Sequence, residues 1–419
     1  MAHDPRPRLL ILTHRRPNPP DRGDRIRSHA WLTGLSPRFH TSLAYADTAE
    51  PSKEDQYFID QHTQRCAHAR ITDARAQRHA SCALLTGRAA TPAAFFDRKL
   101  RRTLDRWDRE QPFHAVLTFC TGMARYTQRL LAARKARDER PPIHVLDLVD
   151  VDSRKWARDA ADTSLPFHKR WVAKIESQRL VPYEAGRRAP LDHLVVTSPH
   201  EANLYKEHIR GVRGDLNPIP IDNGVDLARF PQAPPVASLS PEARQTFLFT
   251  GVLDYPPNTR AVERFAKHIL PKIQDKYPAA RFRIVGRNPP ETWKQHESLS
   301  GGRGVDLIGP VDNVAHEHHH AAISAAPLDY APGVQNKVLE AMAVGRAVVC
   351  SAGAAQGLDA QPNQHLLTAD SDDEFATACI KLLDAPEQSQ ALGQAARARI
   401  AERYDWRTRV DRLAELLTP

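Results

Sequence analysis

Short apolar runs alternate with longer amphipathic stretches in this chain, and they do so in two series separated by a proline-rich segment. The runs of the first series are Leu9–Leu12, His40–Tyr45, Ala115–Phe119, Ile143–Val149 and Leu194–Thr197. Those of the second series are Thr246–Thr250, Ala280–Val285, Val305–Ile308, Ala322–Pro327 and Ala347–Cys350. Parallel neighbouring strands need a long, usually helical, crossover between them, so this alternation predicts α/β architecture with parallel sheets.

Helices are expected between these runs, for example at Arg25–Leu35, Ala93–Trp107 and Ala124–Arg137. The segment Ser198-Pro199-His200-Glu201 has the spacing of a capping box, with proline at the first helical position. The tail, residues 395–417, has the pattern of a helix that is interrupted near Tyr404-Asp405-Trp406.

The proline-rich segment marks a domain boundary. Six prolines between Pro218 and Pro241 surround the turn Asp222-Asn223-Gly224, and such composition is typical of linkers. A chain of 419 residues is long enough for two or three domains. We therefore expect an N-terminal domain at residues 1–222, a C-terminal domain at 223–403 and a last helix, about 404–419, that packs back on the first domain. Two such halves favour ligand binding in a cleft between them.

The positive charge is concentrated in the first half of the chain. Residues 1–200 carry 35 Lys and Arg against 23 Asp and Glu, a net +12, whereas residues 201–419 carry 24 against 27, a net −3. The first half thus suits an anionic partner such as nucleic acid, an anionic membrane face or a phosphorylated acceptor. Solvated Arg-rich helix faces explain the same numbers, and both readings stay open.

Neither disulfide nor metal chemistry is favoured. The five cysteines are scattered and form no CxxC pair, which indicates buried thiols in a reducing compartment.

His316-Glu317-His318-His319-His320 satisfies HExxH, but an apolar strand follows too soon for the long helix of a zinc protease, so we expect a solvated His-rich helix end. Asp150-Val151-Asp152 could hold Mg²⁺ through oxygen, yet acceptor-site and helix-capping roles fit as well. We predict no metal and no bound cofactor.

The most informative segment runs from Gly333 to Gly345. It follows an apolar strand, so we expect a loop that turns into a helix, with Gly333, Val334, Gln335 and Asn336 leading into it. Free N–H groups and the positive end of the helix dipole suit a pyrophosphate, and Lys337 adds a point charge. Glu340 lies one turn further on the same face, where its carboxylate can accept from ribose hydroxyls.

The same segment, followed by Arg346-Ala347-Val348-Val349, resembles the signature of family-4 glycosyltransferases of the GT-B fold. Further matches run in order along about 350 residues of the chain. They are Asp222-Asn223-Gly224-Val225-Asp226, Phe249-Thr250-Gly251 with Asp254 and Asn258, Ile284-Val285-Gly286, and the loop of His14–Arg27 with Gly23 and Asp24. Asp150-Val151-Asp152-Ser153 with Lys155-Trp156 resembles a subgroup associated with bacterial exopolysaccharide and exosortase systems.

The resemblance implies a fold, a donor site and a reaction. The fold is two Rossmann-like domains that face each other across a cleft, and the reaction is retaining transfer of a sugar from a nucleotide-diphosphate donor. The implied donor-binding residues are Gly251, Asp254, Asn258, Arg287, Gly333, Val334, Gln335, Asn336, Lys337 and Glu340. Gly23, Asp24, Asp150 and Asp152 are the implied catalytic residues, near the reacting centre of an acceptor-binding N-terminal domain.

Two departures from the family pattern concern the donor sugar. Pro332 stands where the family usually has the first glutamate of an E-x7-E pair. The Arg and Lys that usually follow the first strand of the C-terminal domain are absent, so phosphate charge rests on Lys337, the helix N-terminus and Arg287.

We therefore expect a cytoplasmic glycosyltransferase that uses a glycan or lipid-linked acceptor in exopolysaccharide or cell-surface polysaccharide synthesis. A cytoplasmic location is expected because the start of the chain has no signal-peptide core and no run of about 18 apolar residues occurs. The basic first half is expected to dock peripherally on the inner face of the cytoplasmic membrane because its net charge of +12 is attracted by anionic lipids. No nucleic-acid motif stands out. The alternatives are a sugar-nucleotide epimerase of the same fold and a non-catalytic carbohydrate- or nucleic-acid-binding protein.

Overall fold

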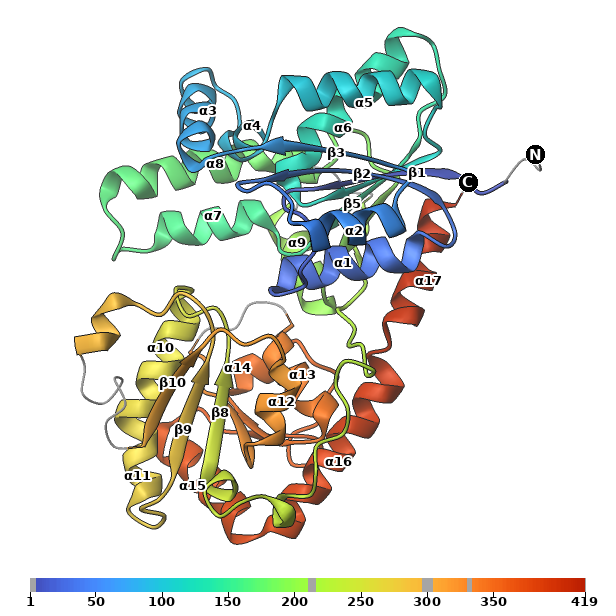
Figure 1. Cartoon of the computed structure of the whole chain (residues 1–419). Helices are drawn as coiled ribbons and strands as arrows, with labels where there is room; N and C mark the ends of the chain where they lie inside the picture. The colour runs from blue at the N-terminus through green and yellow to red at the C-terminus, as the bar shows by residue number, and fades with distance from the viewer. Residues whose placement is uncertain (1–4, 210–215, 296–303, 330–333, 419) are drawn as a thin grey trace. The chain divides into compact units, whose positions relative to one another are not determined.

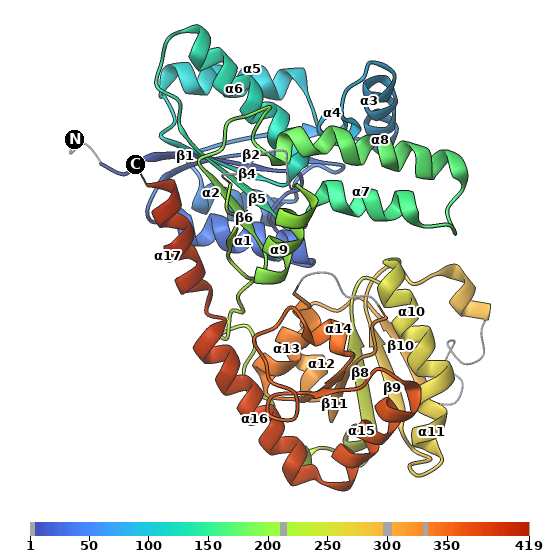
Figure 2. The same cartoon turned by 180° about the vertical axis from the view of Figure 1, so that it is seen from behind.

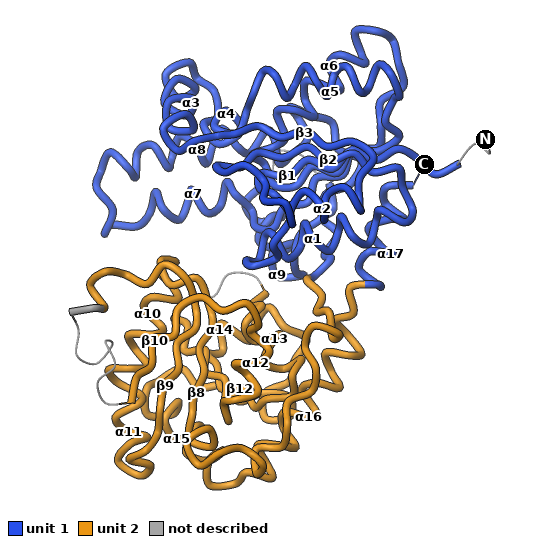
Figure 3. The backbone as a smooth tube through the Cα atoms, in the orientation of Figure 1, with its two compact units in different colours: residues 1–222, 407–419 blue, residues 223–406 orange. Residues whose placement is uncertain are grey.

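The chain folds into two compact units, each built around its own parallel sheet (Figure 3). The computed structural model describes residues 5–209, 216–295, 304–329 and 334–418. Unit 1 comprises Met1–Asp222 and Arg407–Pro419, and unit 2 comprises Asn223–Trp406. The last segment of the chain thus belongs to the unit in which the chain begins.

Unit 1 holds a seven-stranded sheet in the order β3-β2-β1-β4-β5-β6-β7, with all neighbouring strands parallel. Leu9 on the interior strand β1 pairs with Thr41 on one side and Ala115 on the other. The strands are β1 (Arg8–Thr13), β2 (His40–Asp47), β3 (Arg65–Arg70), β4 (Ala115–Phe119), β5 (Ile143–Leu148), β6 (His193–Val196) and β7 (Ile219–Pro220).

Helices cover both faces of this sheet (Figures 1 and 2). They are α1 (Gly23–Leu35), α2 (Lys53–His62), α3 (Asp73–Leu85), α4 (Ala90–Ala94), α5 (Arg98–Glu110), η1 (Thr121–Met123), α6 (Ala124–Ala136), α7 (Asp152–Ala161), α8 (Phe167–Glu184), α9 (Pro199–His208) and α17 (Trp406–Leu417). Helices α5 and α6 lie over one face and α1, α2 and α9 over the other, while α7 and α8 form a hairpin that projects from the unit.

The alternation of side chains along β1 explains the two layers. Leu10 and Leu12 pack in one buried cluster with residues of α5 and α6, such as Leu104. Leu9 and Ile11 are equally buried and point to the opposite face, since successive side chains of a strand alternate. The strand is apolar throughout because both of its faces are covered.

Unit 2 holds a six-stranded parallel sheet in the order β10-β9-β8-β11-β12-β13. Its strands are β8 (Thr246–Thr250), β9 (Arg281–Val285), β10 (Val305–Gly309), β11 (Ile323–Ala326), β12 (Ala347–Cys350) and β13 (Leu367–Thr368). The helices and helical turns are η2 (Val236–Ser238), η3 (Ala243–Gln245), α10 (Pro256–Arg264), the π-helical turn η4 (Phe265–Ile269), α11 (Leu270–Gln274), η5 (Glu291–Gln295), α12 (Val314–His319), α13 (Asn336–Val344), α14 (Ala352–Ala355), α15 (Asp372–Asp384) and α16 (Pro386–Arg403).

The sheet of unit 2 lies between two helical layers. Helices α10 and α11 flank one side and α12 and α13 the other (Figure 1), and α16 packs against α13. A methyl group on Gly393 of α16 would lie 2.1 Å from the carbonyl oxygen of Gly345, so these helices approach as closely as glycine permits. Gly345 also ends α13 in the left-handed conformation (φ 77°), as a helix C-cap glycine does.

All ten expected strands are present, with ends that differ by at most one or two residues. The expected helix Ala93–Trp107 is wrong: α4 ends at Ala94, and Asp97 starts α5 by accepting a hydrogen bond from the Leu100 N–H at 2.7 Å. The Ser198 cap is confirmed by its bond from the Glu201 N–H at 3.1 Å. The tail breaks as expected, between α16 and α17.

None of the described helices is long and apolar enough to cross a membrane.

Candidate active site

Lys337, in the first turn of α13, contacts Phe249 of β8 and Asn258 of α10, the helix that follows β8. Its ammonium donates to Oδ1 of Asn258 at 2.7 Å and lies 5.0 Å from the centre of the Phe249 ring. Asn258 in turn donates through Nδ2 to the carbonyl oxygen of Val252 at 2.8 Å, which fixes the amide. The cation is therefore held at a defined place beside the N-terminus of α13, which carries the positive end of the helix dipole.

Glu340 lies on the same face of α13 as Lys337, one turn later, and both side chains are half-buried. Arg229 lies in the turn whose backbone bond runs from the Arg229 N–H to the Asp226 carbonyl, near the start of unit 2. Its positive charge favours the ionised form of the Glu340 carboxylate. The sequence motif around Asn223 also reaches this helix, because the Asn223 amide donates to Oδ1 of Asn336 at 3.2 Å. Neither Asn223 nor Arg229 was among the expected site residues.

Burial perturbs both ionisable groups of α13. It lowers the pKa of Lys337 to about 8, an effect that the neighbouring Glu340 charge opposes. Burial raises the pKa of Glu340 to about 7, opposed by the positive charges of Lys337 and Arg229. The charged forms of both groups are thus under-solvated, so a phosphate beside Lys337 and hydroxyl donors beside Glu340 would stabilise them.

Glycines bring backbone close together beneath this site. A methyl group on Gly251 would lie 2.8 Å from Nδ2 of Asn258, and one on Gly286 would lie 1.8 Å from the carbonyl oxygen of Gly251. Only glycine fits at Gly286, since that distance is far below any real carbon–oxygen contact. The glycines therefore set the position of Asn258, and through it that of Lys337.

The other expected donor-site residues lie around the ends of the same strands. The Asp254 carboxylate accepts from Nδ2 of Asn288 at 3.0 Å, and the Arg287 carbonyl accepts from the Leu253 N–H at 2.9 Å, so both belong to the contact between the loops after β8 and β9. Val334 packs against the core of unit 2, and Gln335 is the N-cap of α13. Gly333 and Pro332 lie outside the described residues.

A small cavity of about 10 Å³, room for one water molecule, lies under α13. His318 borders it: Nδ1 is hydrogen-bonded to Oγ of Ser324 at 2.9 Å, and Nε2 is buried without a hydrogen-bond partner among the described residues. Burial, together with the charge of Arg346, lowers the pKa of His318 to about 3, so the imidazole is neutral. The expectation of a solvated His-rich helix end is wrong for His318, because Arg346 binds the carbonyl oxygens of His318 and His319 and draws the segment inward.

In unit 1, Asp24 is surrounded by basic groups. Its carboxylate lies 3.2 Å from Nε2 of His14, 2.5 Å from Arg15 and 2.8 Å from Arg22. Burial alone would raise the pKa of Asp24, but the hydrogen bond and charge of His14, with the two arginines, hold it well below its usual range. Gly23 is the first residue of α1. Asp24 is therefore an anion that positions His14, a residue outside the expected set.

Asp150 and Asp152 flank the start of α7. The Asp150 carboxylate pairs with the Lys155 ammonium at 2.5 Å, and Asp152 is the first residue of the helix. Cys120 has a left-handed backbone (φ 62°), and burial, reinforced by the charges of Asp152 and Asp24, raises the pKa of its thiol. The structure thus brings the two expected catalytic segments to one place, the carboxyl edge of the unit 1 sheet around Cys120.

The described residues contain no group of three or more His, Cys, Asp or Glu side chains that could hold a metal ion. Helix α12, which carries the HExxH pattern, is only six residues long, as expected.

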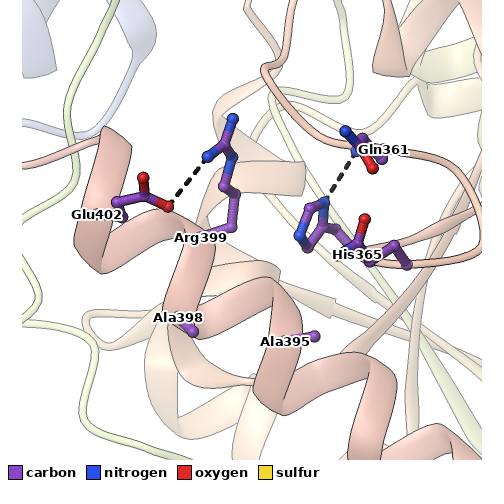
Figure 4. A pocket seen from close by; sticks show the side chains of 7 residues that line it. Gln361, His365, Ala395, Ala398, Arg399 and Glu402 are labelled. Carbon is purple, nitrogen blue, oxygen red and sulfur yellow. Dashed lines mark hydrogen bonds and ion pairs between the residues drawn. The ribbon is translucent and has the colours of Figure 1, made fainter.

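A larger hollow of about 410 Å³ lies elsewhere in unit 2, between α16 and the segment before β13 (Figure 4). Arg399 pairs there with Glu402 at 3.0 Å and with Asp359 at 2.6 Å, and His365 accepts from the Gln361 N–H at 2.9 Å. It contains none of the expected site residues.

Comparison with known proteins identifies the part of the chain that contains this site. The family described as glycosyl transferases group 1 matches residues 244–385. Unit 2 carries a group 1 glycosyltransferase domain. Lys337, Glu340 and Asn258 all lie within the matched residues of this glycosyltransferase domain.

Two curated relatives align with a longer part of the chain than the family does. The chain is 31% identical over 201 residues to the phosphatidyl-myo-inositol mannosyltransferase of Mycolicibacterium smegmatis, covering 45% of this chain and 48% of that protein. It is 26% identical over 249 residues to the glycogen synthase of Mycobacterium tuberculosis, covering 58% and 57%. The chain thus spans about half the length of the curated relatives it matches.

Several solved structures have a fold similar to that of this chain over nearly its whole length. Sucrose-phosphate synthase from Thermosynechococcus elongatus has a TM-score of 0.70 at 17% identity, covering 98% of both chains. Anabaena HepE in complex with UDP and glucose has a TM-score of 0.66 at 14% identity, covering 97% of this chain and 98% of that one. These likenesses show the fold: two parallel-sheet Rossmann-like domains that match GT-B glycosyltransferase structures, as expected.

Proposed function

We propose that the protein is a retaining glycosyltransferase that moves a sugar from a nucleotide-diphosphate donor to a glycan or lipid-linked acceptor in exopolysaccharide or cell-surface polysaccharide synthesis. The observation that carries this proposal is the half-buried pair of Lys337 and Glu340 at the start of α13, whose charged forms are both disfavoured by burial. The pair lies within the group 1 glycosyltransferase domain.

The donor binds through the two ends of a nucleoside diphosphate. Lys337 and the free N–H groups of α13 meet the diphosphate, and the negative charge that develops as the sugar leaves is stabilised there more than in the ground state. Glu340 accepts from ribose hydroxyls. Arg229 provides a second cation toward the same helix. Anabaena HepE, whose structure resembles this fold, is described in complex with UDP and glucose, so a UDP-sugar is the first donor to test.

Unit 1 supplies the acceptor side. Asp150 and Asp152 stand at the end of β5, with Gly23 and Asp24 at the same sheet edge. Asp24 is held charged by three basic groups and therefore serves to position His14. Asp150 or Asp152 orients the acceptor hydroxyl or takes its proton.

The proposed reaction needs no metal, because Lys337 and the helix N-terminus supply the positive charge that a divalent ion supplies elsewhere. Turnover is therefore expected to be unchanged by a chelator.

The test measures nucleotide binding and nucleoside-diphosphate release together. UDP-, GDP-, ADP- and dTDP-sugars are screened by thermal shift, and release of the free diphosphate is then measured with lipid-linked and glycan acceptors. Glu340→Ala is expected to weaken donor binding and turnover, whereas Glu387→Ala, an exposed glutamate on α16, is expected to change neither.

Three results would contradict the proposal. Unchanged affinity and turnover in Glu340→Ala would remove the donor site from α13. Conversion of the donor sugar without diphosphate release would instead indicate an epimerase, and binding without any turnover a non-catalytic protein. Proton NMR of the new glycosidic bond distinguishes retention from inversion.

A further inference from the structure

Two large aromatic side chains stand in solvent at the start of α8. Phe167 is 79% exposed and Trp171 is 59% exposed. They are one turn apart, and the exposed stripe continues through Lys174 and Gln178 at helical spacing. The opposite face of α8, including Ala173 and Leu180, is buried.

The hairpin of α7 and α8 holds these side chains on a firm support. Nε of Arg170 donates to the Ala160 carbonyl at 3.2 Å, which ties the two helices near the turn. In the turn itself, Asp162 accepts from the Ser164 N–H at 2.9 Å. Further along α8, the buried Glu176 accepts from the Ala90 and Thr91 N–H groups at 2.7 Å each. Phe167 and Trp171 are therefore exposed on a helix whose other face is packed and hydrogen-bonded to the rest of unit 1.

Basic side chains outnumber acidic ones at the tip of the hairpin, where Arg158, Lys169, Arg170 and Lys174 lie with Asp159 and Asp162. Lys169 and Lys174 are exposed, and neither has an ion-pair partner within the ranges that the structure describes. Arg158, on α7, is also exposed and pairs with Asp159 at 3.5 Å. The first half of the chain as a whole has a net charge of +12.

We propose that the tip of the α7–α8 hairpin docks on an anionic membrane surface, with Phe167 and Trp171 entering the lipid interface and Lys169 and Lys174 meeting the headgroups. Aromatic rings are favoured at the boundary between headgroups and acyl chains, and basic residues near an anionic leaflet add attraction. Single-stranded nucleic acid can also stack on aromatic side chains beside cations, but the sequence shows no nucleic-acid-binding motif, and RNA binding is one of the outcomes that the test separates.

The docking places the catalytic edge of unit 1 near the membrane. Helix α7 begins at Asp152 and runs ten residues toward the tip, about 15 Å at the rise of an α-helix. If the sugar transfer proposed above is correct, a lipid-linked acceptor would be held within that distance of Asp150 and Asp152. Docking itself does not depend on the transfer reaction.

Co-sedimentation with phosphatidylcholine vesicles, with and without phosphatidylglycerol, tests the proposal at low salt. Wild type is expected to bind the anionic vesicles preferentially. The double variant Phe167→Ala with Trp171→Ala is expected to lose about tenfold or more in vesicle affinity. Tyr57→Ala removes an aromatic side chain that is 69% exposed on α2 and is the matched control.

The charge contribution is tested separately. Lys169→Glu with Lys174→Glu is expected to abolish the preference for anionic vesicles, whereas Arg129→Glu with Lys135→Glu on α6 is expected to preserve it. The blue shift of tryptophan emission that accompanies vesicle binding is expected to disappear in Trp171→Phe.

Equal binding of wild type to neutral and anionic vesicles, or undiminished binding of the aromatic double variant, would overturn the proposal. So would binding to RNA or to an acidic polysaccharide without binding to vesicles. Donor-nucleotide binding is measured on the same samples: vesicle binding without nucleotide binding contradicts sugar transfer and leaves docking intact, and the reverse result contradicts docking alone.

Discussion

The ammonium of Lys337 lies 2.7 Å from Oδ1 of Asn258, although 79 positions separate the two residues in the chain. This contact joins the first turn of α13 to the helix that follows β8. It holds the cation beside the first turn of α13, and it depends on the glycine that leaves room for Asn258.

Replacing Lys337 by methionine should weaken donor binding because it removes the charge while keeping most of the apolar length. The expected loss is about 10- to 100-fold in the affinity for a nucleoside diphosphate, as for a charge-assisted contact. Lys381→Met, on the exposed face of α15, serves as the control. Calorimetric titration checks the affinity, and equal affinities in the two variants would exclude Lys337 from the site.

Donor binding should be strongest between about pH 7 and pH 8, the pKa values of Glu340 and Lys337. Below that window Glu340 gains a proton and accepts poorly from hydroxyls, and above it Lys337 loses its charge. Titrations with a UDP-sugar across pH 5.5–9.5 measure both limbs. Lys337→Arg should flatten the upper limb, since arginine stays charged. An upper limb that persists in this variant would assign it to another group.

Gly286→Ala should destabilise unit 2, because the added methyl would lie 1.8 Å from the Gly251 carbonyl oxygen. A cost above about 2 kcal/mol in the free energy of unfolding is expected, together with weaker donor binding. Gly353→Ala, in α14, meets no atom within 4 Å and should leave stability nearly unchanged. Denaturant titration compares the two variants. Similar stabilities would mean that the loop backbone relaxes freely.

Glu184 should make the stability of unit 1 depend on pH. Burial, reinforced by the charge of Asp152, raises the pKa of Glu184 from 4.5 to about 7. The folded state therefore favours the protonated acid, so this contribution is complete below about pH 4.5 and is lost as the pH rises through about 7, with a total near 3 kcal/mol. Glu184→Gln should remove the dependence and keep an acceptor for the Ser153 N–H, 2.9 Å away.

Unfolding at pH 5 and pH 8 checks this expectation. The stability of wild type should fall relative to that of Glu184→Gln as the pH rises. Glu207→Gln, an exposed position on α9, should behave as wild type. Parallel pH profiles for wild type and Glu184→Gln would show that Glu184 is solvated in the folded protein.

The central strands could be predicted from the sequence because both of their faces are buried. β1 and β8 are continuous apolar runs for this reason. The edge strand β3 was missed, since His68 and Arg70 point outward and only Ala69 is fully buried. β7 and β13 are two residues each, too short to form a pattern.

Helical spacing alone predicts only those residues of the candidate site that share one helix. Lys337 and Glu340 follow from helical spacing, whereas the Asn223 contact to Asn336 spans 113 positions and has no local signal. His318 was hidden for a different reason: three neighbouring histidines and a glutamate have the composition of a solvated surface. Its burial results from the Arg346 guanidinium, which binds the carbonyl oxygens of His318 and His319 from the junction between α13 and β12.

The chain enters unit 2 at Asn223 and leaves it at Trp406, and these two crossings lie against each other: the Val225 N–H donates to the Tyr404 carbonyl at 2.7 Å, and the Trp406 ring lies against Gly224. In topological terms unit 2 is an insertion between β7 and the last helix of unit 1. A single proteolytic cut at either crossing would therefore leave unit 2 covalently joined to part of unit 1 through the other crossing. Residues 223–406 have neighbouring ends, so that they can be excised, or circularly permuted, as one continuous piece, whereas unit 1 can be made continuous only by splicing residue 222 to residue 407.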